Sequence, residues 1–141
     1  MMVQAILIPL FVQVALVFAL AFGMAVLRTR DVRSGAVDRR NIALREAGWP
    51  ARTTQVAYAF SNQFEVPVLF YVLTILSIMT RHADIIFLVL AWIFVLSRLG
   101  HAYVHATSNR VMVRGQIYGV GVLVLMIAWA IFMVRILLGL P

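Results

Sequence analysis

Four long apolar segments constrain this sequence more than any other feature. They cover residues 3–27, 53–79, 85–107 and 115–138, and about 20 apolar residues suffice to cross the hydrocarbon core of a bilayer. Only 12% of the residues are charged and 64% are hydrophobic, whereas a soluble domain averages about 25% charged residues. Little sequence is left for a soluble unit. We therefore predict one all-α domain, residues 1–141, that forms an integral membrane four-helix bundle.

The twelve basic side chains are all arginines, and they are distributed unevenly. Residues 28–52 contain seven of them, and Arg110 and Arg114 follow the third segment, whereas the opposite side has only Arg81 and Arg135. Because basic residues accumulate in cytoplasmic loops, we expect both Arg-rich connections in the cytoplasm and both termini outside. Arginines beside membrane helices also bind lipid headgroups, so the net charge of +7 indicates membrane lipids as partners and not nucleic acid.

Few polar side chains interrupt the apolar segments, and they fall into three groups. Within each group the members are three, four or seven residues apart, so they share one face of a helix. The groups are Asn62 with Glu65, then Arg98 with His101 and His105, and finally Arg114 with Tyr118.

The depth of Glu65 and Arg98 in the membrane suggests that they meet. Glu65 lies twelve residues after Thr53, or about 18 Å at 1.5 Å per residue, and Arg98 lies nine residues before Thr107, or about 14 Å. An ionised carboxylate in hydrocarbon costs at least about 2.5 kcal/mol. We therefore predict an ion pair between Glu65 and Arg98, within one protomer or across a subunit interface. The alternative is a structural pair that only fixes the helix register.

The third-segment histidines have two further interpretations. His101 and His105 are four residues apart, which is a possible spacing for two metal ligands, but the cationic Arg98 on the same face argues against a metal. We predict no metal site. His105 lies close to a helix end, so contact with lipid headgroups is the alternative to a binding role.

Prolines and glycines predict how the helices bend and pack. Pro67 removes one backbone hydrogen bond and clashes one turn back, near Gln63, which would open the second helix beside the Asn–Glu pair. Gly115 and Gly119 have the small-xxx-small spacing that lets membrane helices approach closely. Residues 38–47 are compatible with a short cytoplasmic helix.

Together, NxxE in the second helix, RxxHxxxH in the third and RxxxY at the start of the fourth resemble the MAPEG family, the membrane-associated proteins in eicosanoid and glutathione metabolism. The pattern is most similar to the prostaglandin E synthase branch and its bacterial members. The resemblance implies a homotrimer of four-helix protomers, in a bacterial inner membrane, with glutathione as co-substrate bound between subunits near the cytoplasmic face.

The resemblance also implies roles for individual residues. Asn62 and Glu65 match the glutathione-contacting pair of the second helix, and Arg98 and His101 match the Arg and His of the third. Arg114 matches the fourth-helix Arg that is expected to face the thiol, which makes it the candidate catalytic residue. The implied glutathione-binding residues are Asn62, Glu65, Arg98, His101, His105 and Tyr118.

At three positions the sequence departs from the pattern. The two arginines expected just before NxxE are replaced by Tyr58 and Ser61, and the Tyr expected four residues after the third-helix His is His105. A first-helix Arg of the family matches either Arg28 or Arg30, and the sequence alone does not choose between them.

Two functions follow from this pattern, and a third is disfavoured. The chain has no cysteine, which excludes a thiol nucleophile of its own, but a cation near bound glutathione lowers a thiol pKa of about 8.5. This favours a glutathione-dependent transferase or peroxidase that acts on a lipophilic small-molecule electrophile from the bilayer. The missing arginine pair favours the alternative, a non-catalytic lipid- or ligand-binding protein. A proton pathway through Glu65 and His101 lacks polar residues in the outer halves of the helices.

Overall fold

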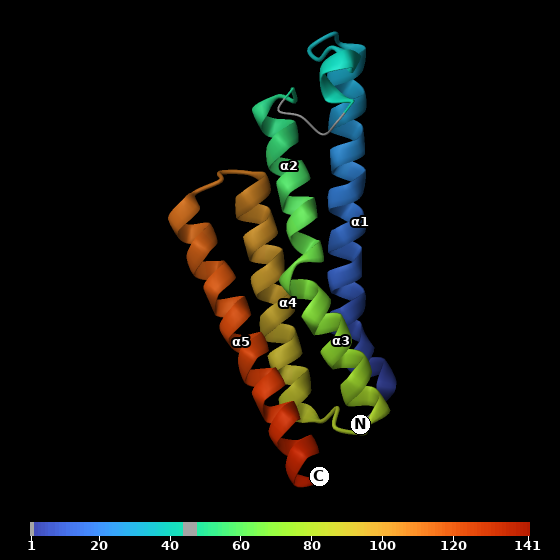
Figure 1. Ribbon diagram of the computed structural model, residues 1–141, viewed down its shortest axis with the longest axis vertical. Helices are drawn as coiled ribbons and strands as arrows, with labels where there is room; N and C mark the ends of the chain where they lie inside the picture. The colour runs from blue at the N-terminus through green and yellow to red at the C-terminus, as the bar shows by residue number, and fades with distance from the viewer. Residues whose placement is uncertain (1, 44–47) are drawn as a thin grey trace.

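The computed structural model describes residues 2–43 and 48–141, and these two ranges contain helices and no strand (Figure 1). Four helical stretches are long and apolar enough to cross a membrane, which confirms the predicted all-α membrane bundle. The elements are α1 (Val3–Arg33), the 3-10 helix η1 (Arg39–Ile42), α2 (Ala51–Ser61), the 3-10 helix η2 (Asn62–Phe64), α3 (Val66–Met79), α4 (Ile85–Ala106) and α5 (Val111–Leu138).

Helix bounds differ from the predicted segments at the polar ends. Helix α1 continues past residue 27 to Arg33, and α5 begins at Val111, so Arg114 lies in its first turns. Arginine is a good helix former, and basic residues in a last helical turn complement the helix dipole, so the helices extend beyond their apolar cores. Of the expected short helix at 38–47, the structure shows η1 with Asp38 as its N-cap; residues 44–47 lie outside the described ranges.

The four membrane segments alternate in direction, with α2 and α3 forming the second segment. Helices α2, α3 and α4 lie between α1 and α5 (Figure 1). Both termini are at one end of the bundle, which we call the terminal end. At the other end α1 and α4 finish and α2 and α5 begin. We call this the Arg-rich end, because the connections there contain the clustered arginines.

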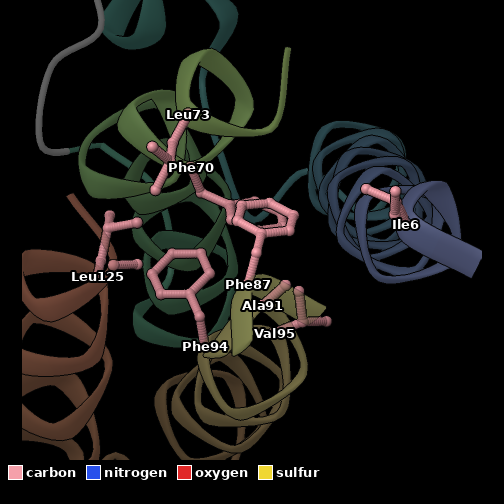
Figure 2. Close-up of a cluster of buried hydrophobic side chains, with 9 residues drawn as sticks. Ile6, Phe70, Leu73, Phe87, Ala91, Phe94, Val95 and Leu125 are labelled. Carbon is pink, nitrogen blue, oxygen red and sulfur yellow. The ribbon is translucent and has the colours of Figure 1, made fainter. Parts of the chain in front are cut away.

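The main hydrophobic core lies toward the terminal end of the bundle. Side chains of α3, α4 and α5 converge there, with α1 adding Ile6 from the side (Figure 2). At its centre the rings of Phe70 and Phe94 lie 4.9 Å apart, in a tilted arrangement. A second, smaller cluster nearer the Arg-rich end contains Leu20, Ala59 and Ala102 among the described residues. Polar groups gather toward this end of the bundle.

The second membrane segment is broken where Pro67 predicted a kink. Helix α2 ends at Ser61, a 3-10 turn covers Asn62–Phe64, and α3 begins at Val66 with Pro67 in its first turn. A proline fits there because the first turn of a helix has no intrahelical acceptor for its missing N–H. Glu65, at the junction, has φ −96° and ψ −109°, outside the helical region. The predicted opening beside the Asn–Glu pair is confirmed.

Two buried polar contacts join α1 to the second membrane segment, one at η2 and one at α2. The Gln13 amide donates to Gln63 Oε1 at 2.9 Å, and the Gln63 amide donates to the carbonyl oxygen of Ala59 at 3.0 Å. Nearer the Arg-rich end, the Thr53 hydroxyl donates to the Asp31 carboxylate. All four side chains are buried. Because amides and carboxylates are costly to bury without partners, these contacts fix the two helices side by side, and the broken segment with them.

Candidate functional site

A cavity of about 960 Å³ opens at the Arg-rich end, bounded by α1, α2, the end of α4 and the start of α5. Among the described residues, two guanidinium groups and one imidazole line it, and no carboxylate does. Such a surface suits an anionic ligand, because charges of one sign in a low-dielectric cleft reinforce each other. Its polar and aromatic lining residues are Arg28, Trp49, Thr54, Gln55, Tyr58, Phe60, Ser61, His105, Asn109 and Arg114.

The first-helix arginine of the cavity is Arg28. Its guanidinium carbon lies 5.0 Å from the centre of the Trp49 ring, a cation–π distance, and its Nε is buried with no hydrogen-bond partner among the described residues. Arg30 instead lies on another face of α1, 69% exposed and 3.8 Å from the Asp31 carboxylate. Of the two first-helix arginines, Arg28 therefore lines the cavity and Arg30 does not.

Arg114 lines the cavity from the start of α5. Its NH1 donates to Asn109 Oδ1 at 2.5 Å. Asn109 and Trp49 were not among the predicted site residues. Only weak signals in the sequence point to them: Asn109 is a turn-forming residue in the short connection between two apolar segments, and Trp49 precedes Pro50 at the start of α2.

A second polar group lies deeper between α4 and α5. Arg98 is completely buried, with its guanidinium carbon 4.8 Å from the Tyr118 ring and 5.8 Å from the Phe94 ring. The ring of His101 lies 5.5 Å from that of Tyr118 and 5.6 Å from that of His105. The predicted third-helix and fourth-helix groups therefore meet, and His105 joins the buried group to the cavity wall.

Gly121 makes room for this buried arginine. A Cβ at position 121 would clash with Ser97 Oγ and lie 3.3 Å from NH2 of Arg98. A Cβ at Gly115 or Gly119 would meet nothing within 4 Å. The predicted glycine pair therefore makes no close contact within the protomer, and the close approach of α5 to α4 occurs at Gly121 instead.

Glu65 does not pair with Arg98 within the protomer, so that form of the prediction is wrong. The ion pairs among the described residues involve Asp31 and Asp84, and Glu65 is exposed. Asn62 is half-buried, whereas Glu65 lies exposed at the helix break, where its own backbone is non-helical. Pairing across a subunit interface stays a prediction.

Several buried polar atoms near the cavity have no hydrogen-bond partner in the described part of the chain. They are Asn62 Oδ1, the Nδ1 atoms of His101 and His105, and all three guanidinium nitrogens of Arg98. Leaving a buried polar group unpaired costs about 1–3 kcal/mol, so partners from a ligand or a second subunit would be strongly favoured here.

The model of the MAPEG family matches residues 6–134, nearly the whole chain. The chain belongs to the MAPEG family. Comparisons with curated proteins and with solved structures give no significant match. Membership and the four apolar helices together make this MAPEG protein an integral membrane protein.

Proposed function

We propose that this MAPEG protein binds glutathione in the cavity at its Arg-rich end and uses the thiol to attack a lipophilic electrophile or peroxide from the bilayer. The observation that supports this most directly is the composition of the cavity wall. In the part of the chain that the structure describes, Arg28 and Arg114 line it and no carboxylate does, and glutathione brings two carboxylates and a thiol that must ionise. The family is consistent with a glutathione-related or lipid-metabolic role.

In the proposed mechanism, Arg114 stabilises the thiolate and Arg28 binds a carboxylate. A guanidinium 4 Å from a thiolate contributes up to about 4 kcal/mol at an effective dielectric constant of about 20. One pKa unit corresponds to 1.36 kcal/mol, so one arginine is enough to ionise the thiol near neutral pH. The thiolate then forms the C–S bond with the electrophilic carbon, while the leaving group departs or the opened ring takes up a proton.

Assembly as a homotrimer is part of the proposal. Glu65 is exposed on the protomer surface, where a neighbouring subunit would bring it to an arginine or to the ammonium group of glutathione. Gly115 and Gly119 also face outward, on a helix surface suited to close packing with a second copy. Native mass spectrometry of the purified protein should give a trimer; monomer or dimer alone would contradict a shared site.

A non-catalytic ligand-binding protein is the second candidate. Tyr58 and Ser61 lie in the cavity wall at the positions where the related pattern has two arginines. The loss of two cationic contacts would weaken glutathione binding, and the hydroxyl and aromatic groups suit a less charged amphiphile.

Isothermal titration with glutathione in detergent tests the proposal. The parent should bind, and Arg28→Ala should weaken binding by about tenfold, since losing a hydrogen bond to a charged group costs about 1.5–3 kcal/mol. Arg30→Ala is the matched control, because Arg30 is exposed outside the cavity. Absence of glutathione binding to the parent would favour the second candidate; binding without turnover of electrophiles or peroxides would do the same.

The expected orientation has the Arg-rich end in the cytoplasm of a bacterial cell and both termini outside its inner membrane. The absence of cysteine allows a direct test. Ser34→Cys, near the end of α1, should resist a membrane-impermeant thiol reagent in intact cells. A cysteine introduced at Arg81, on the α3–α4 connection, should react. The reverse labelling pattern would indicate the opposite membrane orientation.

A further inference from the structure

The short connection between α4 and α5 holds the candidate catalytic arginine through a neutral side chain. Asn109 Oδ1 accepts a hydrogen bond from Arg114 NH1 at 2.5 Å, and both residues line the cavity. The contact spans five positions, from the connection to the second turn of α5. The guanidinium of Arg114 is therefore tied to the rim of the cavity.

The backbone fixes the direction of the Asn109 side chain. Its N–H donates to the Val104 carbonyl oxygen at 2.7 Å, which anchors the residue to the last turn of α4. Its φ is +49°, in the left-handed region that asparagine tolerates better than most residues. The backbone of Asn109 is thus attached to α4, and its amide oxygen is hydrogen-bonded to Arg114 of α5. The position of this oxygen therefore does not depend on a flexible loop.

Arginines inside and outside the cavity have different kinds of partner. Within the cavity, Arg114 contacts the Asn109 amide and Arg28 the face of Trp49; both partners are neutral. Outside it, Arg30 lies 3.8 Å from the carboxylate of Asp31, and Arg135 forms an ion pair at 2.7 Å. A carboxylate partner would cancel the positive charge that a bound anion needs, whereas an amide or an aromatic ring orients the group and leaves its charge in place.

We propose that Asn109 is a positioning residue for Arg114: it aims the guanidinium into the cavity through NH1 and keeps its charge available for the thiolate. Guanidinium has five N–H donors, so those outside this bond can serve an anion. The proposal rests on the proposed glutathione function and adds a residue that acts through Arg114.

Two substitutions separate orientation from charge. Asn109→Asp keeps the size of the side chain and tolerates the same backbone, but it places a carboxylate against the guanidinium. Asn109→Gly keeps the positive φ and removes the hydrogen bond. The measurement is the thiolate absorbance of bound glutathione as a function of pH. Asn109→Asp should raise the apparent pKa of the bound thiol by about one unit or more, toward the free value of about 8.5. Asn109→Gly should raise it by less.

Arg110→Gln is the matched control, because Arg110 lies in the same connection but does not line the cavity. It should leave the thiol titration of the parent unchanged. If the Asp and Gly variants bind glutathione and titrate like the parent, the positioning role is overturned, even if both melt at lower temperature. If the parent itself binds glutathione without forming thiolate, Arg114 and Asn109 both lose their roles. If the parent binds no glutathione, the proposed function fails as well.

Discussion

The polar side chains at the two ends of this membrane bundle differ in how fully they are hydrogen-bonded within the chain. At the terminal end, Arg135 donates to the Asp84 carboxylate at 2.7 Å, and the same carboxylate caps α4 by accepting from the Phe87 N–H at 2.9 Å. His82 lies 3.0 Å from Thr80 Oγ1 and 3.0 Å from the carbonyl oxygen of Leu140. Toward the Arg-rich end, Arg98, His101 and His105 have side-chain nitrogens without hydrogen-bond partners in residues 2–43 and 48–141.

The difference distinguishes polar groups that serve the fold from those that are available for binding. Side chains at the terminal end close the α3–α4 connection and attach the end of α5 to it, so their donors and acceptors are used within the chain. Toward the Arg-rich end, Thr53 and Asp31 also pair within the chain, but Arg98, His101 and His105 are buried with side-chain nitrogens that have no partner among the described residues. A buried cation without a partner destabilises a protein, so it is retained where something outside the protomer pairs with it.

The largest expected effect concerns the buried arginine and Glu65 in the assembled protein. Breaking a buried ion pair by removing one partner costs about 3–5 kcal/mol, so Glu65→Gln should lower the melting temperature in detergent strongly. Arg98→Met, which removes the charge and keeps much of the volume, should also destabilise the trimer. The double variant should lose less than the sum, because the two residues interact.

The sign of the Arg98→Met effect decides whether the pair exists. If Arg98 has no partner in the assembly, removing its charge relieves a desolvation penalty, and the variant melts at a higher temperature than the parent. That result, together with an unchanged melting temperature for Glu65→Gln, would contradict the predicted ion pair between subunits.

A smaller loss of stability is expected from overpacking the space beside Arg98. Gly121→Ala places a methyl group against Ser97 Oγ and the Arg98 guanidinium, and overpacking of this kind costs about 1–3 kcal/mol. Gly100→Ala is the control, since its Cβ would meet Ile117 at an ordinary 3.7 Å and alanine favours helix. Adding Ser97→Ala to the Gly121 variant should recover part of the loss. Equal melting temperatures for the two alanine variants would contradict the close contact at Gly121.

At the cavity, Arg114→Ala should raise the pKa of the bound thiol by about one unit, equivalent to about 1.4 kcal/mol. The variant should still form trimers and bind glutathione, but its thiolate absorbance at neutral pH and its conjugating activity should fall about tenfold. Arg114→Lys should recover only part of this, because lysine keeps the charge without the planar fork of donors. Paired ultraviolet titrations measure the effect, and equal thiolate fractions in parent and alanine variant would exclude Arg114 from the mechanism.

The smallest effect belongs to the terminal end. Burial raises the pKa of Asp84, but the hydrogen bonds from the Phe87 N–H and Arg135 outweigh it, so the pKa lies below its ordinary value of 3.8. A lowered carboxyl pKa stabilises the fold above the ordinary value, and this contribution is lost as the pH falls through the folded-state pKa. Because the Asp84 side chain is 37% exposed, solvent screening limits its contribution to about 1 kcal/mol or less.

Thermal melts of Asp84→Asn between pH 2 and 7 test this sign. Asparagine can still cap α4, so the variant removes the ion pair alone. It should melt slightly below the parent at neutral pH and converge with it at the acidic limit. A difference that grows as the pH falls would contradict the lowered pKa.

The sequence by itself determined the membrane class, the number of spanning segments, the break near Pro67 and the family. These follow from local properties: hydrophobic length decides whether a helix can cross a bilayer, and a proline removes a hydrogen bond wherever it stands. The spacing of Arg98, His101 and His105 also placed them correctly on one face of α4, because helical periodicity does not depend on the rest of the fold.

Only the tertiary structure decided which side chains share the cavity. Arg28 and Arg30 are two residues apart, and the packing of α1 against α2 turns one into the cavity and the other outward. Asn109 became visible as a partner of Arg114 only through the left-handed turn between α4 and α5. Glu65 lies exposed at the break between α2 and α3, where the backbone is non-helical, and its spacing from Asn62 did not predict this. The position of a side chain depends on the backbone rotation of every intervening residue, so contacts between distant segments cannot be read from spacing alone.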